Sequence, residues 1–147
     1  MQTGPYISPD MYRKFIKPRQ RRIFDFIHSK TRARVFYHSC GSVYDLIPDF
    51  IEIGVDILNP IQTSAAKMDP KWLKENYGDK LTFWGGGIDT QKTLPFGTPE
   101  EIRAQVKERI EIFGRGGGFV FAAIHNVQTG VSTENLAALY ESFMEYR

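Results

Sequence analysis

The chain has 147 residues, of which 41% are hydrophobic and 24% are charged. This length and composition are typical of one globular domain with a hydrophobic core. The formal net charge of +2 is too small to indicate a nucleic-acid-binding protein. A single cysteine excludes an internal disulfide and is typical of a reducing compartment. Because the apolar runs are too short to span a membrane and no secretory signal is visible, we expect a cytoplasmic protein.

The first predicted helix begins at Ser8 and Pro9, which suit an N-cap and the first helical position. Its apolar pattern reaches Ile16 before Pro18, where we expect an interruption, and a second helical pattern continues to Ile27. Six basic residues in this region are interpreted as the solvated face of a helix, with a phosphate- or carboxylate-binding patch as the alternative. They are Arg13, Lys14, Lys17, Arg19, Arg21 and Arg22.

Four units of strand and helix follow. The predicted strands are "ARVFYHSC", "VDILNP", "LTFWGGG" and "GFVFAAIH", and helical patterns follow each of them. The clearest helix has Thr98 as its N-cap, Glu101 completing a capping box, and Gly114 as a fitting C-cap. Apolar strands that alternate with helices are typical of an α/β fold with a parallel sheet and helices outside.

Four such units amount to half of a (β/α)8 barrel. We predict a single domain over residues 1–147, without a linker that would divide it. A half-barrel leaves two open strand edges and an uncovered interior face. We therefore expect the chain to pair with another copy, to flatten its sheet, or to be one part of a longer protein.

Polar residues end each apolar run, at the carboxyl edge of the sheet where α/β proteins collect functional groups. The first strand ends in His38, Ser39 and Cys40. Trp84 is a candidate pocket floor beside the glycines of the third strand. The other candidate substrate-binding residues are Asn59 and Gln62, Asp89 and Gln91, and Asn126 and Gln128.

His38 and Cys40 are two residues apart on an extended segment, so their side chains point to the same face. An imidazole and a thiolate suit zinc, which takes three protein ligands in catalytic sites. We take His125 as the candidate third ligand and Asp89 as the reserve. The alternative is that Cys40 is a small buried hydrophobe beside a histidine. A surface role is expected for His28.

Two glycine-rich stretches do not match a phosphate-binding loop. "GRGGGF" is interpreted as a helix stop with a tight turn into the next strand. "WGGGID" is interpreted as allowing the close approach of a ligand or of a neighbouring loop. The aromatic residues of the strands alternate, and we expect most of them in the core. They are Phe36, Tyr37, Phe83, Trp84, Phe119 and Phe121.

Five stretches together resemble the uroporphyrinogen decarboxylase superfamily. They are "GPYISPDMYRKFIKP", "YHSCGSV", "GVDILNPIQ", "WGGGIDTQKTLPFGTPEEIRAQV" and "HNVQTGVSTENLAAL". The superfamily includes the decarboxylases of haem biosynthesis and the corrinoid-dependent methyltransferases. The resemblance implies a (β/α)8 barrel, of which this chain is similar to the C-terminal half.

The "HSCG" stretch resembles the His-x-Cys-Gly zinc motif of the methyltransferase branch. This resemblance implies that His38 and Cys40 bind zinc, which lowers the pKa of a thiol substrate so that the thiolate accepts a methyl group from a corrinoid protein. The methyltransferases usually supply a cysteine as the third ligand near the last strand, and His125 stands at the matching place. The decarboxylase branch also carries a histidine there, without a metal.

Three functions are therefore compatible with the sequence. The first is a zinc-dependent methyltransferase between a corrinoid protein and a thiol or similar small-molecule acceptor. The second is porphyrinogen decarboxylation, a carboxy-lyase activity, although the arginine-rich stretch and early-strand aspartate that decarboxylases use are not present in this chain. The third is a non-catalytic half-barrel that associates with another copy or with an N-terminal half-barrel.

Overall fold

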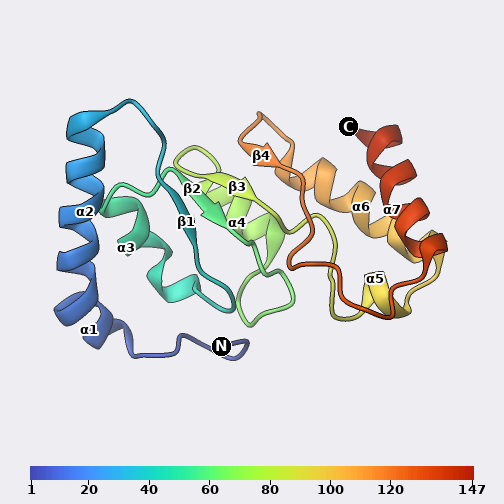
Figure 1. Cartoon of the computed structure of the whole chain (residues 1–147), viewed down its shortest axis with the longest axis horizontal. Helices are drawn as coiled ribbons and strands as arrows, with labels where there is room; N and C mark the ends of the chain where they lie inside the picture. The colour runs from blue at the N-terminus through green and yellow to red at the C-terminus, as the bar shows by residue number, and fades with distance from the viewer.

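The computed structural model describes all residues from Met1 to Arg147. Figure 1 shows an open arc in which the strands lie in the middle and helices lie at both ends and behind them. The four strands are all parallel and their order is that of the sequence. They are β1 Phe36–His38, β2 Ile57–Asn59, β3 Thr82–Trp84 and β4 Phe119–Val120. The α/β fold with parallel strands in a partial barrel is confirmed, and each strand is shorter than its apolar run.

Seven α-helices flank this sheet and leave one face open: α1 Pro9–Met11, α2 Lys17–Lys30, α3 Ile47–Glu52, α4 Pro70–Tyr77, α5 Thr93–Phe96, α6 Pro99–Phe113 and α7 Thr133–Tyr146. The capping signals hold, because Thr98 and Glu101 form both hydrogen bonds of the capping box of α6. Gly114 is the C-cap of that helix, in a right-handed conformation. The short helix α5 lies in a segment for which no helix was predicted. None of the helices combines the length and apolar composition needed to cross a bilayer.

The interruption expected at Pro18 is wrong. Helix α1 continues through a π-helical turn, Tyr12–Ile16, directly into α2. Pro18 therefore lies in the first turn of α2, where a proline is tolerated. The wider π-turn before it is of the kind that occurs as a short segment within a longer α-helix.

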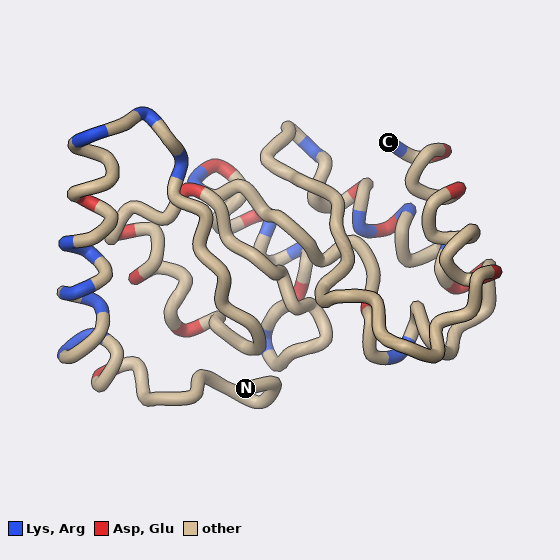
Figure 2. Tube along the Cα trace, viewed as in Figure 1, with Lys and Arg blue, Asp and Glu red and all other residues tan.

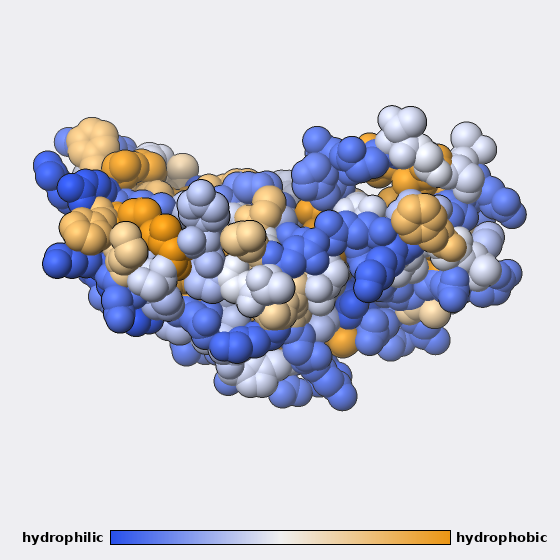
Figure 3. Space-filling model, turned by 90° about the horizontal axis from the view of Figure 1, so that it is seen from below, coloured by the Kyte–Doolittle hydropathy of each residue, from blue (hydrophilic) through white to orange (hydrophobic).

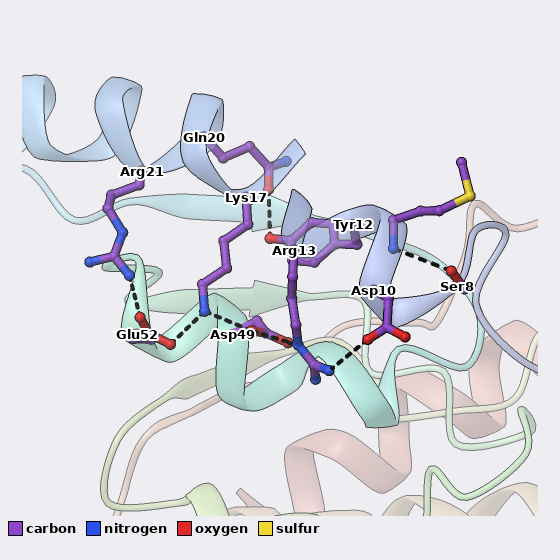
Figure 4. Close-up of polar contacts among 10 residues, drawn as sticks. Ser8, Asp10, Tyr12, Arg13, Lys17, Gln20, Arg21, Asp49 and Glu52 are labelled. Carbon is purple, nitrogen blue, oxygen red and sulfur yellow. Dashed lines mark hydrogen bonds and ion pairs between the residues drawn. The ribbon is translucent and has the colours of Figure 1, made fainter. Parts of the chain in front are cut away.

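Three of the six basic residues pair with carboxylates of α3, and of these only Lys17 is largely buried. Arg13 and Lys17 bind the carboxylate of Asp49 in α3, at 3.0 Å from Nε and 2.7 Å from Nζ. Lys17 and Arg21 also pair with Glu52, so that the N-terminal helices are fastened to α3 (Figure 4). Figure 2 shows the Lys and Arg residues that mark α2. Lys14, Arg19 and Arg22 remain exposed as expected, and Figure 3 shows hydrophobic residues among the hydrophilic ones at this end of the molecule.

Alternate strand residues point to opposite faces of the sheet, and only one face is covered. Leu58 and Phe83 are neighbours in the strand register and are fully buried in the main core with Phe113 of α6. Phe36 and Trp84 lie on the other face, 47% and 38% exposed, in an edge-to-face contact of 5.2 Å. Four of the six strand aromatics pack in or against the core as expected, and this pair is the exception because no part of the chain covers the interior face.

The two glycine stretches behave differently. Gly116 to Gly118 all have positive φ, as a tight turn into β4 requires. A Cβ at Gly86, whose φ is +82°, would lie 2.9 Å from the carbonyl oxygen of Ile61, and one at Gly87 would lie 2.5 Å from the ring of Phe121. The "WGGGID" stretch therefore admits neighbouring parts of the chain.

Candidate functional site

The His38–Cys40 pair lies at the carboxyl end of β1. The Nε2 atom of His38 is 3.0 Å from the Sγ atom of Cys40, which confirms that the two side chains share a face. Both residues are exposed. The alternative of a buried apolar cysteine is therefore wrong, because Cys40 lies after the strand has ended rather than within the core.

Asn59 fixes the orientation of the imidazole. Its Nδ2 donates to the carbonyl oxygen of Trp84 at 2.9 Å, so its Oδ1 faces Nδ1 of His38 at 2.6 Å. An amide oxygen only accepts, so Nδ1 of His38 carries the proton and donates it. In the neutral imidazole, the free lone pair is then on Nε2, which faces Cys40. Asn59 thus serves as an orienting residue, and both ends of its carboxamide are already engaged.

The turn after Cys40 is held from two sides. The backbone N–H of Gly41 donates to Oε1 of buried Gln62 at 2.7 Å, and the N–H of Ser42 donates to the carbonyl oxygen of Met1 at 2.8 Å. Gly41 has φ of +87°, and a Cβ there would lie 2.5 Å from the Met1 oxygen. Only glycine fits this position without a shift of the backbone. The N-terminal segment therefore forms part of the site.

A cavity of about 400 Å³ opens beside Cys40. Three of the predicted substrate-binding residues line it, namely Gln62, Gln91 and Gln128. The remaining lining residues are Cys40, Thr90, Ile124 and His125. Thr90 was missed, although its place directly after Asp89 at the end of the third predicted strand is a signal that could have identified it.

Four predicted substrate-binding residues do not line this cavity. Asn59 is engaged as described, and Trp84 lies on the open interior face beside Phe36. Asp89 is only 8% exposed, and its Oδ1 accepts from the backbone N–H of Gln91 at 2.8 Å. Its own N–H donates to Gln105 at 2.9 Å, so Asp89 shapes the loop. Asn126 is exposed, and its carbonyl oxygen accepts from Gln128 at 3.2 Å.

A second cavity, of about 320 Å³, lies on the other side of the cysteine loop. It is mostly apolar and is formed between the N-terminal segment and α3. Cys40 lines this cavity as well as the first. Tyr12 and Tyr37 are bridged there by Gln20, at 2.7 and 2.8 Å, and burial raises the pKa of Tyr12 well above its ordinary value. The thiol thus lies between a polar cavity and an apolar one.

The residues present fit two positions of a zinc site. A tetrahedral zinc with ligand bonds of about 2.0 and 2.3 Å would hold its nitrogen and sulfur ligands roughly 3.5 Å apart, so a small movement from 3.0 Å suffices. A hydrogen bond to the second ring nitrogen, which Asn59 supplies, is the usual support of a ligating histidine. No group of three His, Cys, Asp or Glu side chains is close enough to hold a metal ion. His125 shares the polar cavity with Cys40 but does not lie with the pair.

His28 is partly exposed and lies 3.1 Å from Asp56, with its Nε2 toward the carboxylate. Asp56 also binds Arg34 and the backbone N–H of Val35. This cluster lies at the start of β1 and β2, opposite to the cysteine loop. The expected surface position of His28 agrees with the structure, and the residue has no part in the candidate site.

The sequence profile of the uroporphyrinogen decarboxylase (URO-D) family matches residues 2–146. The chain belongs to the uroporphyrinogen decarboxylase family. Two curated relatives are the uroporphyrinogen decarboxylases of Pseudoalteromonas translucida (strain TAC 125) and Methylococcus capsulatus (strain ATCC 33009 / NCIMB 11132 / Bath). They are 33% and 29% identical to this chain over 73 residues, which is 50% of this chain and 20% of each relative.

A solved structure of the same architecture is a methyltransferase from Methanosarcina mazei. The two superpose with a TM-score of 0.72 at 26% sequence identity, over 95% of this chain and 38% of the methyltransferase. This family member therefore spans well under half the length of that structure, and its four strands correspond to part of a barrel. The half-barrel architecture inferred from the sequence is in agreement with this finding.

Proposed function

We propose that the chain supplies the thiol-activating part of a zinc-dependent methyltransferase, which moves a methyl group from a corrinoid protein to a thiol acceptor. The observation that carries the proposal is the 3.0 Å contact between His38 and Cys40 at the carboxyl end of β1. The likeness to the Methanosarcina mazei methyltransferase supports the reaction class.

In this proposal, His38 and Cys40 hold the metal through Nε2 and Sγ. Zinc, when bound, lowers the pKa of the acceptor thiol and so raises the fraction of thiolate at neutral pH. Asn59 keeps the histidine tautomer that leaves Nε2 free, and Gln62 holds the backbone of the cysteine loop. The polar cavity receives the acceptor beside Cys40. Methyl transfer forms a sulfur–carbon bond and breaks a cobalt–carbon bond, whose electron pair leaves with cobalt.

His125 is the proposed third ligand. It lines the same cavity as Cys40 and lies in an exposed segment after β4. This segment ends at Gly130, which has a positive φ of +102°. Ligation by His125 requires this segment to move toward Cys40. A site of one thiolate and two imidazoles is within the usual donor range of zinc.

We further infer that the active form is a closed barrel, made with an N-terminal half-barrel or a second copy of this chain. Phe36 and Trp84 expose apolar area on the interior face, and β1 and β4 each leave one edge unpaired. The experiment is sedimentation of the full chain alone and with a family N-terminal half. The inference is supported if the wild-type chain associates and the Trp84→Glu variant does not. It is contradicted if the wild-type chain is a monomer both alone and with the N-terminal half.

Zinc content tests the central proposal. The full chain and its Cys40→Ser variant are loaded with zinc, passed through a desalting column, and measured for metal. We expect about one zinc per wild-type chain and a loss in the variant, with Ser39→Ala as the matched control that retains the metal. Equal metal in all three proteins would contradict the proposal.

Porphyrinogen decarboxylation is the second candidate function, because both curated relatives carry that name. It predicts binding of a polycarboxylated tetrapyrrole that is indifferent to chelators. A spectroscopic titration with a porphyrin carrying eight carboxylates, with and without a chelator, distinguishes the two functions. Tight binding that survives removal of zinc favours decarboxylation over methyl transfer.

A further inference from the structure

Beyond Cys40 and His125, the polar cavity is lined mainly by uncharged side chains that form hydrogen bonds. Three of its seven lining residues are glutamines, one is a threonine, and none is Lys, Arg, Asp or Glu. Apart from a metal held at Cys40, this chain offers a ligand group in the cavity no Lys or Arg side chain to pair with. Anionic groups are usually bound in proteins by Arg, Lys or clustered backbone N–H groups, so this lining favours a neutral ligand.

Two glutamines present donors to the cavity. Oε1 of Gln62 is occupied by the N–H of Gly41 at 2.7 Å, which leaves the Nε2 group of the buried side chain as the free end. Oε1 of Gln91 accepts from Nε2 of Gln2 at 2.6 Å, so its Nε2 is again the free end. Both residues can therefore donate to a ligand oxygen.

The third glutamine is oriented the other way. Nε2 of Gln128 is directed to the carbonyl oxygen of Asn126 at 3.2 Å and to Nδ1 of His125 at 3.4 Å. Its Oε1 is the free end and can only accept. The cavity thus offers donors and an acceptor together. A carboxylate or sulfonate has no N–H for this acceptor, and its charge would be repelled by the amide oxygen.

Thr90 adds a group without a partner. The residue is 6% exposed, lines the cavity, and has a buried hydroxyl oxygen for which the chain provides no hydrogen bond. Buried hydroxyls are nearly always paired, and an unpaired one weakens the fold unless a ligand or water completes it. A hydroxyl can both donate and accept, so it suits either end of an amide.

We propose that this cavity binds a neutral, amide-like group carried by the thiol acceptor. The ligand carbonyl oxygen accepts from Gln62 and Gln91, and the ligand N–H donates to Gln128. The unpaired hydroxyl of Thr90 forms a further hydrogen bond to the same ligand amide. This inference rests on the proposed function, since it takes the cavity beside Cys40 as the acceptor site. It adds the class of acceptor, a thiol with a neutral carboxamide in place of an acidic tail.

The experiment compares 3-mercaptopropionamide with 3-mercaptopropionate, which have the same shape and differ in charge and in the N–H group. Binding to the cobalt-loaded full chain is followed by the sulfur-to-metal absorption band, and the side-chain NH₂ signals of Gln62 and Gln91 are followed by NMR. We expect the amide to bind about tenfold tighter or more, as hydrogen-bond discrimination in a built site allows, and to shift both NH₂ signals. Equal affinity, or unmoved NH₂ signals, would overturn the proposal.

Variants sharpen this test. Thr90→Val removes the unpaired hydroxyl at nearly constant shape, so it should weaken amide binding about tenfold while leaving the unfolding free energy equal or higher. Thr129→Val, an exposed threonine outside the cavity, is the matched control. Gln128→Lys replaces the acceptor by a cation and should reverse the preference toward the acid. Wild-type discrimination in either cavity variant would overturn the assignment.

The two proposals fail separately. Cobalt bands that respond equally to both thiols would overturn the amide site while leaving thiol activation in place. NH₂ signals of Gln62 and Gln91 that shift with the amide, in metal-loaded protein whose absorption band does not change, would support the amide site. That second result would remove the methyltransferase function.

Discussion

The amide oxygen of Asn59 lies 2.6 Å from Nδ1 of His38. The two residues are direct neighbours in the register of β1 and β2, so the sheet itself sets their separation. Asn59 is anchored in turn on the backbone of Trp84 at the end of β3. A chain of hydrogen bonds across three strand ends therefore presents one ring nitrogen of His38 to Cys40, before any metal arrives.

Asn59→Ala should lower zinc affinity by about 10- to 100-fold, because loss of a supporting hydrogen bond leaves the ligating imidazole free to turn. Asn59→Asp should retain most of the affinity, since a carboxylate still accepts from Nδ1. Competition with a chromophoric chelator measures both. Asn76→Ala, an exposed position on α4, is the control. An Asn59→Ala protein that binds zinc like wild type would remove the orienting role.

Asp49→Asn should lower the free energy of unfolding by about 3 kcal/mol, because it leaves Lys17 in a largely buried position without its buried partner. Asp49 and Lys17 side chains are 6% and 13% exposed. Urea denaturation of the two proteins gives the difference. Glu52→Gln is the matched control and should have the smaller effect, because that carboxylate is exposed. Equal losses would show that burial of the pair does not matter.

The same carboxylate makes stability depend on pH. Burial by itself raises the pKa of Asp49, but hydrogen bonds and charges from Arg13 and Lys17 outweigh it, so the pKa lies below the ordinary value of 3.8. The folded chain therefore binds fewer protons than the unfolded chain in this range. The stabilisation is complete above about pH 5 and is lost as the pH falls through the folded pKa.

This pH dependence can be checked by measuring the urea denaturation midpoints of the wild type and of Asp49→Asn between acidic and neutral pH. The difference in stability should be largest near neutral pH and should shrink toward zero in acid. A difference that stays constant across the series would mean that the ion pair is not its source.

Alanine substitutions at Gly86 and Gly116 allow the cost of steric contact to be distinguished from the cost of backbone strain. Both have positive φ, but a Cβ at Gly86 meets the Ile61 backbone at 2.9 Å, whereas one at Gly116 meets nothing within 4 Å. Gly116→Ala should cost about 1 kcal/mol, from the left-handed conformation alone. Gly86→Ala adds overpacking and should cost about 3 kcal/mol. Thermal unfolding compares the two, and equal costs would contradict the role given to the Ile61 contact.

Local signals predicted the helices best. The capping box of Thr98 and Glu101 and the N-cap Ser8 depend on residues only three positions apart, and both have the expected hydrogen bonds. The contact of His38 with Cys40 is also local, since two residues on an extended segment must share a face. These features could be read without knowing where the rest of the chain lies.

The remaining features depend on distant parts of the chain. Asn59 looked like a substrate-binding residue at a strand end, because its partners on β1 and β3 are 21 and 25 positions away. Lys17 looked solvated because Asp49 is 32 positions away. Phe36 and Trp84 are exposed because no part of this chain packs on the interior face of the sheet. The contacts of these residues depend on strand register and on which elements pack nearby. The periodicity of apolar residues along the sequence contains neither.

Zinc K-edge X-ray absorption of the zinc-loaded full chain tests the central claim most directly. The account predicts one sulfur ligand at about 2.3 Å together with nitrogen ligands at about 2.0 Å, and loss of the sulfur contribution in Cys40→Ser. A spectrum with nitrogen and oxygen ligands alone, unchanged in the variant, would contradict the assignment of His38 and Cys40 as the metal-binding pair.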